Sequence, residues 1–254
     1  MPNPRKFIYS ASAVAVAAKF DGPHALNRAW ATVALPMIGG SDISTEKGPN
    51  GNPVLSFASA TASVKGSENS GVFTTINTVT VEGLNILSGW LEADLELTLR
   101  FDYADGNPAV LGAVVSNQPF TRLVVGGQDF GNVTLDNEPV KQAAKDHDKF
   151  RNDLKQGTIL KDKHHINKSK KNKKELKAHA SIAVDPARLK FDPATGEYGY
   201  VGAPERRVYI GEWAEDEDWQ GIVGLRIVFE STNPQAKGEI VIADWLGDNG
   251  QFYP

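Results

Sequence analysis

The stretch WLEADLELTLRFDY, at Trp90–Tyr103, alternates apolar and polar side chains without a slip from Leu91 onward. Successive side chains of an extended strand point to opposite faces, so this pattern gives one apolar face and one charged face. A helix would scatter the same leucines around its circumference. At ~3.3 Å per residue, a strand of this length would extend roughly 45 Å. The stretch therefore predicts a long, half-buried antiparallel strand and a protein built on a long sheet.

Weaker alternation elsewhere predicts a series of shorter strands. These are Ile8–Phe20, Trp30–Leu35, Val54–Val64, Val72–Glu82, Ala109–Val115, Thr121–Val125, Ser181–Val184, Arg207–Trp213, Ile222–Glu230 and Gly238–Trp245. The last two, joined by Ser231–Lys237, are expected to form a hairpin. Gly39–Pro53 is polar and rich in Gly and Pro, which is typical of a surface loop, and Gly83–Gly89 is expected to link two strands. The sequence thus predicts an all-β fold, an antiparallel sandwich or barrel-like sheet.

One segment breaks the β pattern. Between Asp136 and Lys155, apolar side chains recur at helical spacing, with Asn137 as a cap and Gly157 as a stop. A lysine-rich sequence without apolar periodicity follows. We therefore divide the chain into a β domain, whose first part spans residues 1–135 and whose closing strands span 180–254, and a helical, basic insertion at 136–179.

Charge is segregated along the chain. Residues 141–178 contain 13 Lys and Arg against 5 Asp and Glu, whereas the remainder contains 14 against 26. Such segregation usually reports on partners more than on fold. The basic charge that we expect to contact a polyanion or another subunit is carried by Lys161, Lys163, Lys168, Lys170, Lys171, Lys173, Lys174 and Lys177. The matching acidic surface, beside Trp213 and Trp219, consists of Glu212, Glu215, Asp216, Glu217 and Asp218.

Three interpretations of the lysines stay open. They form a solvated or intramolecular segment, they contact the acidic surface of another copy, or they bind an external polyanion such as acidic polysaccharide or nucleic acid. Nucleic-acid modules usually add aromatic side chains that stack on bases. Phe150 is the only aromatic residue between 141 and 178, so the sequence favours the first two interpretations.

Composition excludes several classes of protein. The 254 residues contain no cysteine, which excludes disulfides, zinc–thiolate sites and a cysteine nucleophile. There is no run of about 18 apolar residues that would predict a transmembrane helix. Met1–Lys6 followed by Phe7–Ala18 imitates a secretion signal. Its alternating pattern and its polar Tyr9 and Ser10 favour a strand instead.

Motifs for chemistry are also missing. The chain has no phosphate-binding GxxxxGK[ST] or GxGxxG loop, no GxSxG nucleophile turn and no HExxH. His147, His164, His165 and His179 lack the spacing of metal ligands and are interpreted as solvated side chains. Asp102, Asp105 and Asn107 offer oxygen ligands in one turn, so calcium is the one cofactor considered, against the simpler interpretation of an ordinary turn.

The segment TVTVEGLNILSGWLEAD, at Thr78–Asp94, carries the pattern V-x-G-L-x-I-L-x-G-x-L-x-A-D. This pattern resembles the strand–turn–strand signature of bacterial choice-of-anchor extracellular proteins of the P-type group. Phe7–Pro23 and Ile222–Ala243 are similar to the first strand and the closing hairpin of that family. The resemblance implies a secreted, surface-associated β domain without assigned catalysis, and no functional residues carry over. The chain departs from the family in the segment 136–178 and in having no evident anchor.

We expect a non-enzymatic structural protein that assembles with copies of itself into a surface layer, a fibre or another extracellular assembly. Missing catalytic motifs, small polar side chains on flat strands and segregated charge favour this function. Phe7–Phe20 has few charges, so we expect it to be an exposed edge strand that pairs with a neighbouring chain. The alternatives are a virion structural protein, such as a tail-tube or capsid component, and a glycan-active enzyme that uses carboxylates such as Asp102 or Asp218.

Overall fold

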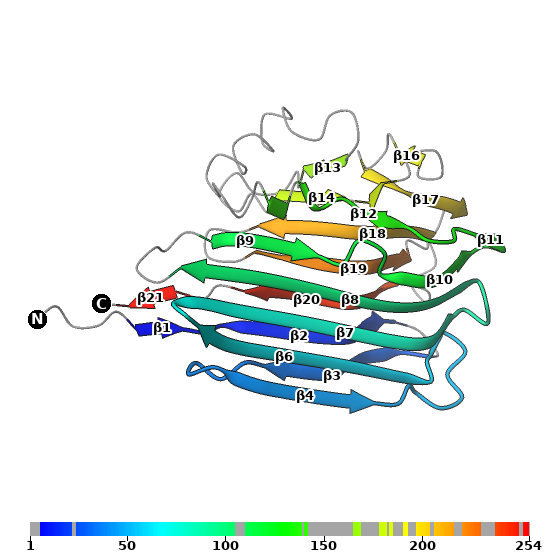
Figure 1. Ribbon diagram of the computed structural model, residues 1–254. Helices are drawn as coiled ribbons and strands as arrows, with labels where there is room; N and C mark the ends of the chain where they lie inside the picture. The colour runs from blue at the N-terminus through cyan, green and yellow to red at the C-terminus, as the bar shows by residue number, and fades with distance from the viewer. Residues whose placement is uncertain are drawn as a thin grey trace, which may run out of the picture.

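A computed structural model of the chain describes residues 6–21, 24–104, 110–138, 140–141, 165–168, 178–181, 183–184, 190–192, 197–203, 206–215, 220–229, 237–248 and 251–253. Most of these residues lie in β-strands, and every strand pair among them is antiparallel. Two large sheets pack face to face as a sandwich (Figure 1). The predicted all-β class and its antiparallel sandwich are confirmed.

The meander sheet has the strand order β11-β10-β8-β7-β6-β4, with β5 paired to β7 and β9 paired to β8. It consists of β4 (Gly40–Glu46), β5 (Leu55–Ser56), β6 (Ser59–Asn69), β7 (Val72–Ile86), β8 (Leu91–Ala104), β9 (Val110–Val115), β10 (Phe120–Val125) and β11 (Gln128–Asp129). Most of its strands follow one another in the chain, because short turns join antiparallel neighbours.

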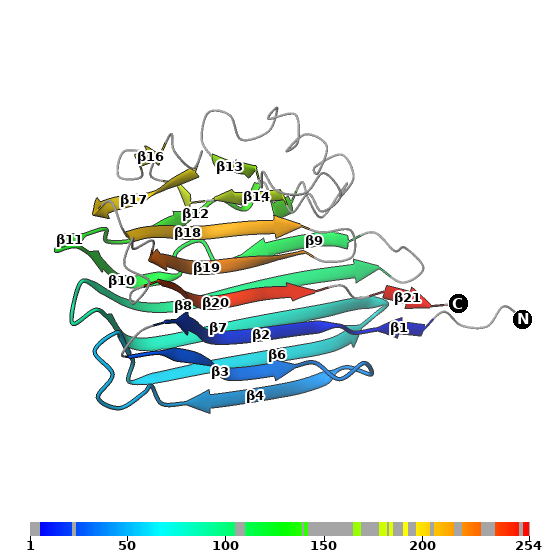
Figure 2. The ribbon, with the colours of Figure 1, turned by 180° about the vertical axis from the view of Figure 1, so that it is seen from behind.

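The terminal sheet holds strands from both ends of the chain in the order β13-β14-β18-β19-β20-β2-β3, with β17 paired to β18 and to β16. It consists of β2 (Ala11–Phe20), β3 (Leu26–Ala34), β13 (His165–Lys168), β14 (Ala178–Ser181), β16 (Lys190–Asp192), β17 (Glu197–Ala203), β18 (Arg206–Glu215), β19 (Gln220–Phe229) and β20 (Gly238–Asp248). Figure 2 shows it in front of the meander sheet. Two short ladders join β1 (Lys6–Ile8) to β21 (Gln251–Tyr253) and β12 (Thr134–Leu135) to β15 (Ala183–Val184).

The long strand behaves as its sequence predicts. β8 pairs with β7 along almost its whole length, and its side chains alternate between buried and more exposed positions. Its leucines, Phe101 and Tyr103 face the terminal sheet, where β8 packs on β19 and β20, and are at most 3% exposed. The core also holds Trp30 and Trp213 from the terminal sheet, both fully buried. Burial of these apolar faces, one from each sheet, is the main favourable contribution to folding.

A row of small residues crosses the terminal sheet. Five neighbouring strands contribute one residue each, and the strand registers align these residues. They are Ala31 of β3, Ala15 of β2, Ala243 of β20, Gly224 of β19 and Gly211 of β18. Three of them have left-handed backbones, with φ of 51° at Ala31, 54° at Ala243 and 61° at Gly211. We call these five residues the Ala/Gly row.

The Ala/Gly row changes which residues face the core. On β18, Ile210 and Trp213 both belong to the core although they are three positions apart, and on β19 the same holds for Ile222 and Leu225. The register of β18 against β19 does not shift here, so both strands change face together. The register of β20 against β19 and against β2 does shift beside Ala243, which is a β-bulge in β20. A Cβ on Gly224 would lie only 3.1 Å from Leu97 Cδ2 of β8, so the two sheets approach closely here.

Several sequence predictions need correction. Phe7–Phe20 is not an exposed edge: it forms β1 and β2, and β2 lies between β20 and β3. Its few charges reflect burial within the sheet. Gly39–Pro53 is not all loop, because it contains β4, an exposed edge strand that needs no apolar alternation. Gly83–Gly89 is not a simple link, because β7 continues through a bulge at Gly83 as far as Ile86.

Candidate functional site

β4 is the outermost strand of the meander sheet and, among the described strands, pairs only with β6. Four large hydrophobic side chains are exposed in the described part of the chain, and three lie on β4 or in the turn before it. Met37, Ile38 and Ile43 are 67%, 80% and 68% exposed. We call this strand, with the turn, the β4 edge. Apolar side chains on a one-sided strand are typical of an interaction surface.

The main chain of the β4 edge has little protection. The N–H of Ile43 donates to Oδ1 of its neighbour Asp42 at 2.9 Å. Gly40–Glu46 contains neither Lys nor Pro, which blunt many natural edge strands. The end of β4 is tied to β3 of the terminal sheet, where Glu46 accepts hydrogen bonds from Arg28 Nη2 at 2.5 Å and from the N–H of Ala31 at 2.9 Å.

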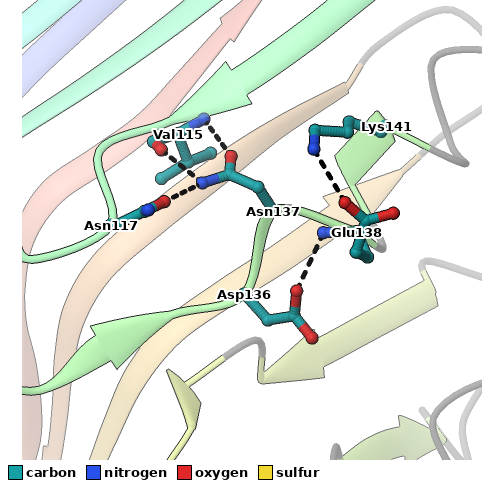
Figure 3. Close-up of polar contacts among 6 residues, drawn as sticks. All are labelled: Val115, Asn117, Asp136, Asn137, Glu138 and Lys141. Carbon is teal, nitrogen blue, oxygen red and sulfur yellow. Dashed lines mark hydrogen bonds and ion pairs between the residues drawn. The ribbon is translucent and has the colours of Figure 1, made fainter.

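The opposite side of the meander sheet is covered at β9. Oδ1 of Asn137 accepts a hydrogen bond from the N–H of Val115 at 2.6 Å, and Nδ2 donates to the carbonyl oxygen of Val115 at 2.7 Å (Figure 3). Nδ2 also donates to Oδ1 of Asn117. The Asn137 amide thus pairs with Val115 as a neighbouring strand would, and closes the β9 edge where the β4 edge stays open.

The same contacts fix the start of the predicted insertion. Oδ1 of Asp136 accepts a hydrogen bond from the N–H of Glu138 at 2.9 Å, so Asp136 is the cap and the prediction of Asn137 was wrong. Residues 137, 138, 140 and 141 have helical backbones and Val140 is buried. The remainder of the helix predicted for Asp136–Lys155 lies outside the described residues.

Of the eight lysines predicted to contact a polyanion or another subunit, the structure describes Lys168. It lies on β13, and Lys168, Ala178 and Glu215 stand in one row across β13, β14 and β18. The described strands of the basic insertion therefore pair with their own chain, and the contacts of the Lys168 side chain remain a prediction. Lys161, Lys163, Lys170, Lys171, Lys173, Lys174 and Lys177 lie outside the described residues, and their predicted contacts remain predictions.

The predicted acidic surface is only partly described. Glu212 does not belong to an accessible acidic surface, because it is 2% exposed and its carboxylate is paired with Arg226. Its position on β18 explains this, since Glu212 follows the left-handed Gly211, with φ of 61°, and lies on the face that also carries Arg226 of the neighbouring strand. Glu215 ends β18 in the row with Lys168. Asp216, Glu217 and Asp218 lie outside the described residues, and their part remains a prediction.

Arg226 organises the outer face of the terminal sheet. Its guanidinium donates to Glu212, from Nε to Oε2 at 2.5 Å and from Nη2 to Oε1 at 2.8 Å. Nη1 lies 3.5 Å from Oε1 of Glu239, and the group covers the ring of Tyr209 at 4.1 Å. Burial lowers the pKa of Arg226, but its bonds to Glu212 and the attraction of Glu239 outweigh burial, so the pKa is raised. Arg226 is therefore a fixed positive charge.

A groove of about 460 Å³ lies beside this network, over β2, β3 and β20. Its lining residues are Ala17, Ala18, Lys19, Asn27, Arg28, Ala29, Glu239, Val241 and Asp244. Oδ1 of Asp244 is buried and has no hydrogen-bond partner. Burial, and then the charge of Glu239, raise the pKa of Asp244 to about 6. The groove is thus lined by two carboxylates, those of Glu239 and Asp244, and Oδ1 of Asp244 is shielded from solvent without a hydrogen-bond partner.

The outer face of the meander sheet is plain by comparison. Thr78 and Thr98 share a hydrogen bond between their Oγ1 atoms at 3.1 Å, and Thr45 and Thr61 share one at 3.0 Å. These pairs satisfy the hydroxyls across neighbouring strands.

The predicted calcium site receives little support. Asp102 accepts hydrogen bonds from Arg100 Nη2 at 2.9 Å and from Thr74 Oγ1 at 2.6 Å, so its carboxylate already faces a cation. Asp105 and Asn107 lie outside the described residues. Among the residues that the structure describes, no group of three His, Cys, Asp or Glu could hold a metal ion, and no helix is long and apolar enough to span a bilayer.

Fold and site together define an antiparallel β-sandwich protein with an exposed strand edge at β4 and a polar groove over β2, β3 and β20. Residues 7–200 match the family model described as a domain of unknown function (DUF8256), and the chain belongs to this family. No curated protein and no solved structure matches the chain.

The sequence did not identify Ile43, Arg226, Glu239 and Asp244 as functional candidates. Ile43 was hidden in a polar segment, although an isolated Ile among Ser, Asp and Thr is a usable sign of an exposed edge. Arg226 was visible as the one charge inside the apolar run Ile222–Phe229, and a charge in such a run usually has a buried partner. Nothing in the sequence brought Glu239 and Asp244 into one groove.

Proposed function

We propose that this protein is a non-enzymatic structural module that assembles with further copies of itself into a layer, a fibre or another extended assembly. The observation that carries the proposal is the β4 edge, an exposed strand with three exposed apolar side chains. A strand from a second copy would bond to its outward main-chain groups, as in β-strand addition.

Two kinds of contact would contribute to the free energy of this association. Main-chain hydrogen bonds extend the meander sheet, and burial of each large apolar side chain contributes about 1.5–3 kcal/mol. Ile43 lies within the strand, whereas Met37 and Ile38 precede it, so one docked strand could cover all three. The covered β9 edge cannot accept a strand where Asn137 occupies Val115, which favours assembly through the β4 edge.

The lysine-rich segment gives this assembly a second, charge-based contact in the proposal. Its partner would be acidic groups of another copy, as the segregated charge suggests. The resemblance to choice-of-anchor proteins supports a location outside the cell or on its surface. Charge pairs at a surface weaken with salt, whereas an apolar edge does not, so salt separates the two contacts.

The test is light scattering coupled to size exclusion at low and high salt, with negative-stain images of the same fractions. We expect wild type to form oligomers that persist at high salt, and Ile43→Lys to be monomeric in both conditions. Val114→Lys is the matched control, because Val114 is also an exposed apolar residue of the meander sheet, at 47%. Thermal unfolding of both variants confirms that they are folded.

Two outcomes would contradict the proposal in different ways. A wild-type monomer at every concentration and salt would exclude self-assembly. Oligomers that are unchanged by Ile43→Lys and dissolve at high salt would exclude the β4 edge and transfer the role to the lysine-rich segment.

A further inference from the structure

We propose that the β4 edge binds the β4 edge of a second copy, antiparallel and about a twofold axis, with Ile43 opposite Ile43. This pairing presupposes the self-assembly proposed above and specifies the strand, the register and the symmetry of its first contact. A contact of this kind closes at a dimer, so a layer or a fibre would consist of dimers that a second contact joins.

The main-chain groups of Ile43 point away from β6 and out of the sheet. The N–H of Ile43 donates to Oδ1 of Asp42 at 2.9 Å. Along an antiparallel strand, successive residues direct their N–H and C=O groups to opposite sides. Ser41 and Thr45 therefore point the same way as Ile43, and these three residues offer donors and acceptors to a further strand.

Hydrogen bonds on the far side of the meander sheet give the same direction. The N–H of Ser116 donates to the carbonyl oxygen of Thr98 at 3.0 Å, so the main-chain groups of Thr98 point away from β7. Opposite residues in an antiparallel pair either bond to each other or both point away. Thr98 is opposite Thr78 on β7, which therefore bonds to Ser63 on β6. Ser63 is opposite Ile43 on β4, whose main-chain groups therefore point outward.

These directions restrict how two β4 strands can pair. Outward groups meet only when Ser41, Ile43 and Thr45 of one copy face the same set in the other. Centred on Ile43, the pairing places Ser41 opposite Thr45 and uses the whole strand, Gly40–Glu46. Each of the three outward pairs exchanges two main-chain bonds, which gives about six hydrogen bonds across the twofold axis.

The charges of β4 favour this register over its neighbours. Centred on Ile43, the pairing places Asp42 opposite Ser44. A shift of two residues in one direction places Asp42 opposite Asp42, and a shift in the other direction places it opposite Glu46, and like charges in such positions are destabilising. In the favoured register these carboxylates meet only diagonally, at roughly 7–8 Å, and Glu46 is already bonded to Arg28 at 2.5 Å.

The pairing also covers exposed apolar surface. Ile43 is 68% exposed and lies on the outer face of the meander sheet, since its partner Ser63 stands between the buried Ala62 and Val64. Across the twofold axis the two Ile43 side chains would lie side by side, and removal of their apolar surface from water favours association. In Figures 1 and 2, β4 is the lowest strand and β3 lies above it, so β3 does not project past the edge.

The other edge of the meander sheet does not fit β4. Among the described strands, that side ends in β11, which has two residues, and in β9, where Asn137 occupies Val115. Head-to-tail extension of the meander sheet is therefore disfavoured. The β4 edge, by contrast, matches itself in its main-chain groups and in its charges, which favours the twofold pairing.

Disulfide trapping tests the register, because the chain contains no cysteine. Ser41→Cys and Thr45→Cys are purified separately, mixed in reduced form and oxidised, and mass spectrometry assigns the disulfides. Opposite residues bring their Cα atoms to ~5.5 Å, which a disulfide spans, whereas identical positions of the two copies lie too far apart. We expect the disulfide between the two variants to exceed that between copies of either one by about tenfold or more.

Ser41→Cys mixed with Val114→Cys is the matched control, because Val114 is exposed on the meander sheet but lies away from the β4 edge. This mixture should give a statistical distribution of disulfides. The same statistical distribution from Ser41→Cys with Thr45→Cys would overturn the proposal.

Two double variants test the pairing without a covalent bond. Ser41→Glu/Thr45→Lys places opposite charges across the twofold axis, whereas Ser41→Glu/Thr45→Glu places like charges there. The dissociation constant of the dimer, measured by sedimentation equilibrium, should be larger in the second variant by about tenfold or more. Thermal unfolding establishes that both variants are folded. Equal dissociation constants would overturn the proposal.

The size of the wild-type species separates this pairing from self-assembly as a whole. At high salt, light scattering should give a dimer, because salt weakens contacts between surface charges. Species larger than a dimer at high salt, without the disulfide between the two variants, would overturn the pairing and leave self-assembly standing. Dimers that form this disulfide and do not grow at low salt would support the pairing and contradict the extended assembly.

Discussion

The two sheets of the sandwich differ in how the polar side chains on their outer faces find hydrogen-bond and ion-pair partners. In the meander sheet, β7 and β8 pair without a register shift from Val72 to Val81, and the outer face there carries hydroxyls that bond to each other, such as Thr78 with Thr98. The terminal sheet is interrupted by the Ala/Gly row, and its outer face holds a buried ion pair, Arg226 with Glu212, and the groove with Asp244. Along the uninterrupted part of β7 and β8, cross-strand pairs satisfy polar groups locally, whereas the outer face of the terminal sheet carries charges that depend on a single partner.

This difference separates structural from functional regions. Side chains on the regular face have neighbours at fixed spacing on both sides, so no single pair is essential. Bulges re-aim side chains and are frequent next to functional sites. We therefore expect the largest stability effects in the terminal sheet, whose described outer face also holds a buried carboxylate oxygen without a hydrogen-bond partner, Oδ1 of Asp244. Four predictions test this contrast, beginning with the largest expected effect.

Removing the buried cation should have the largest effect. Arg226→Met leaves Glu212, whose side chain is 3% exposed, without its partner, and should lower the free energy of unfolding by about 3–5 kcal/mol. The matched control is Arg100→Met on the meander sheet, where the Arg100 side chain is 50% exposed and should cost about 0.2–1 kcal/mol. Urea unfolding of both variants measures the difference. Equal losses would contradict the contrast between the sheets.

The carboxyl of Asp244 should make stability depend on pH. Its pKa of about 6 in the folded protein exceeds the ordinary value of 3.8, so between these values the folded state keeps a proton that the unfolded state loses. The free energy of unfolding therefore falls by about 1–3 kcal/mol in total as the pH rises from about 4 to 6. Above that range it does not change further through this group. Glu239, Lys19 and Arg28 are the charged groups that share the groove.

Asp244→Asn provides the measurement. The difference in unfolding free energy between variant and wild type should change across pH 4–6 by this amount, in favour of the variant at higher pH. Asn27→Ala in the same groove is the comparison, because it removes no ionisable group. A difference that does not vary with pH would show that Asp244 titrates normally.

The meander sheet could be predicted well from the sequence, and the reason is its regularity. Leu91–Tyr103 alternates because one face is buried and the other is wet, so periodicity alone identified β8. The same reasoning failed at β4, whose residues are exposed on both faces. It also failed to recognise β2 as an internal strand, because few charged residues are expected both in an edge strand that pairs with another chain and in a buried strand.

The groove and the ion pair could not be predicted in the same way. They depend on which strands become neighbours, since β20 pairs with β2, from the other end of the chain. Glu239 and Asp244 meet Lys19 and Asn27 only through that pairing, at separations above 200 residues. The Ala/Gly row adds to the difficulty, because Ala and Gly at positions 15, 31, 211, 224 and 243 carry no signal of their own until strand pairing aligns them.

The Ala/Gly row should tolerate enlargement poorly. In Gly224→Ala, the new Cβ would lie 3.0 Å from the Cβ of Ala243 and 3.1 Å from Leu97 Cδ2, and we expect a loss of about 1–3 kcal/mol. Gly112→Ala on β9 is the matched control, because a Cβ there meets no atom within 4 Å. Thermal unfolding compares the two. If Gly224→Ala is as stable as its control, the two sheets are not in close contact at this row.

The smallest effect is expected on the regular face. The Oγ1 atoms of Thr78 and Thr98 lie 3.1 Å apart, and a double-mutant cycle with Thr78→Val and Thr98→Val should give a coupling of about 0.2–1 kcal/mol. Each single variant keeps a branched side chain that suits a strand, so the cycle isolates the hydroxyl pair. A coupling as large as that of Arg226 with Glu212 would mean that the regular face also depends on single pairs. The two sheets would then not differ in how strongly the stability of each depends on single side-chain pairs.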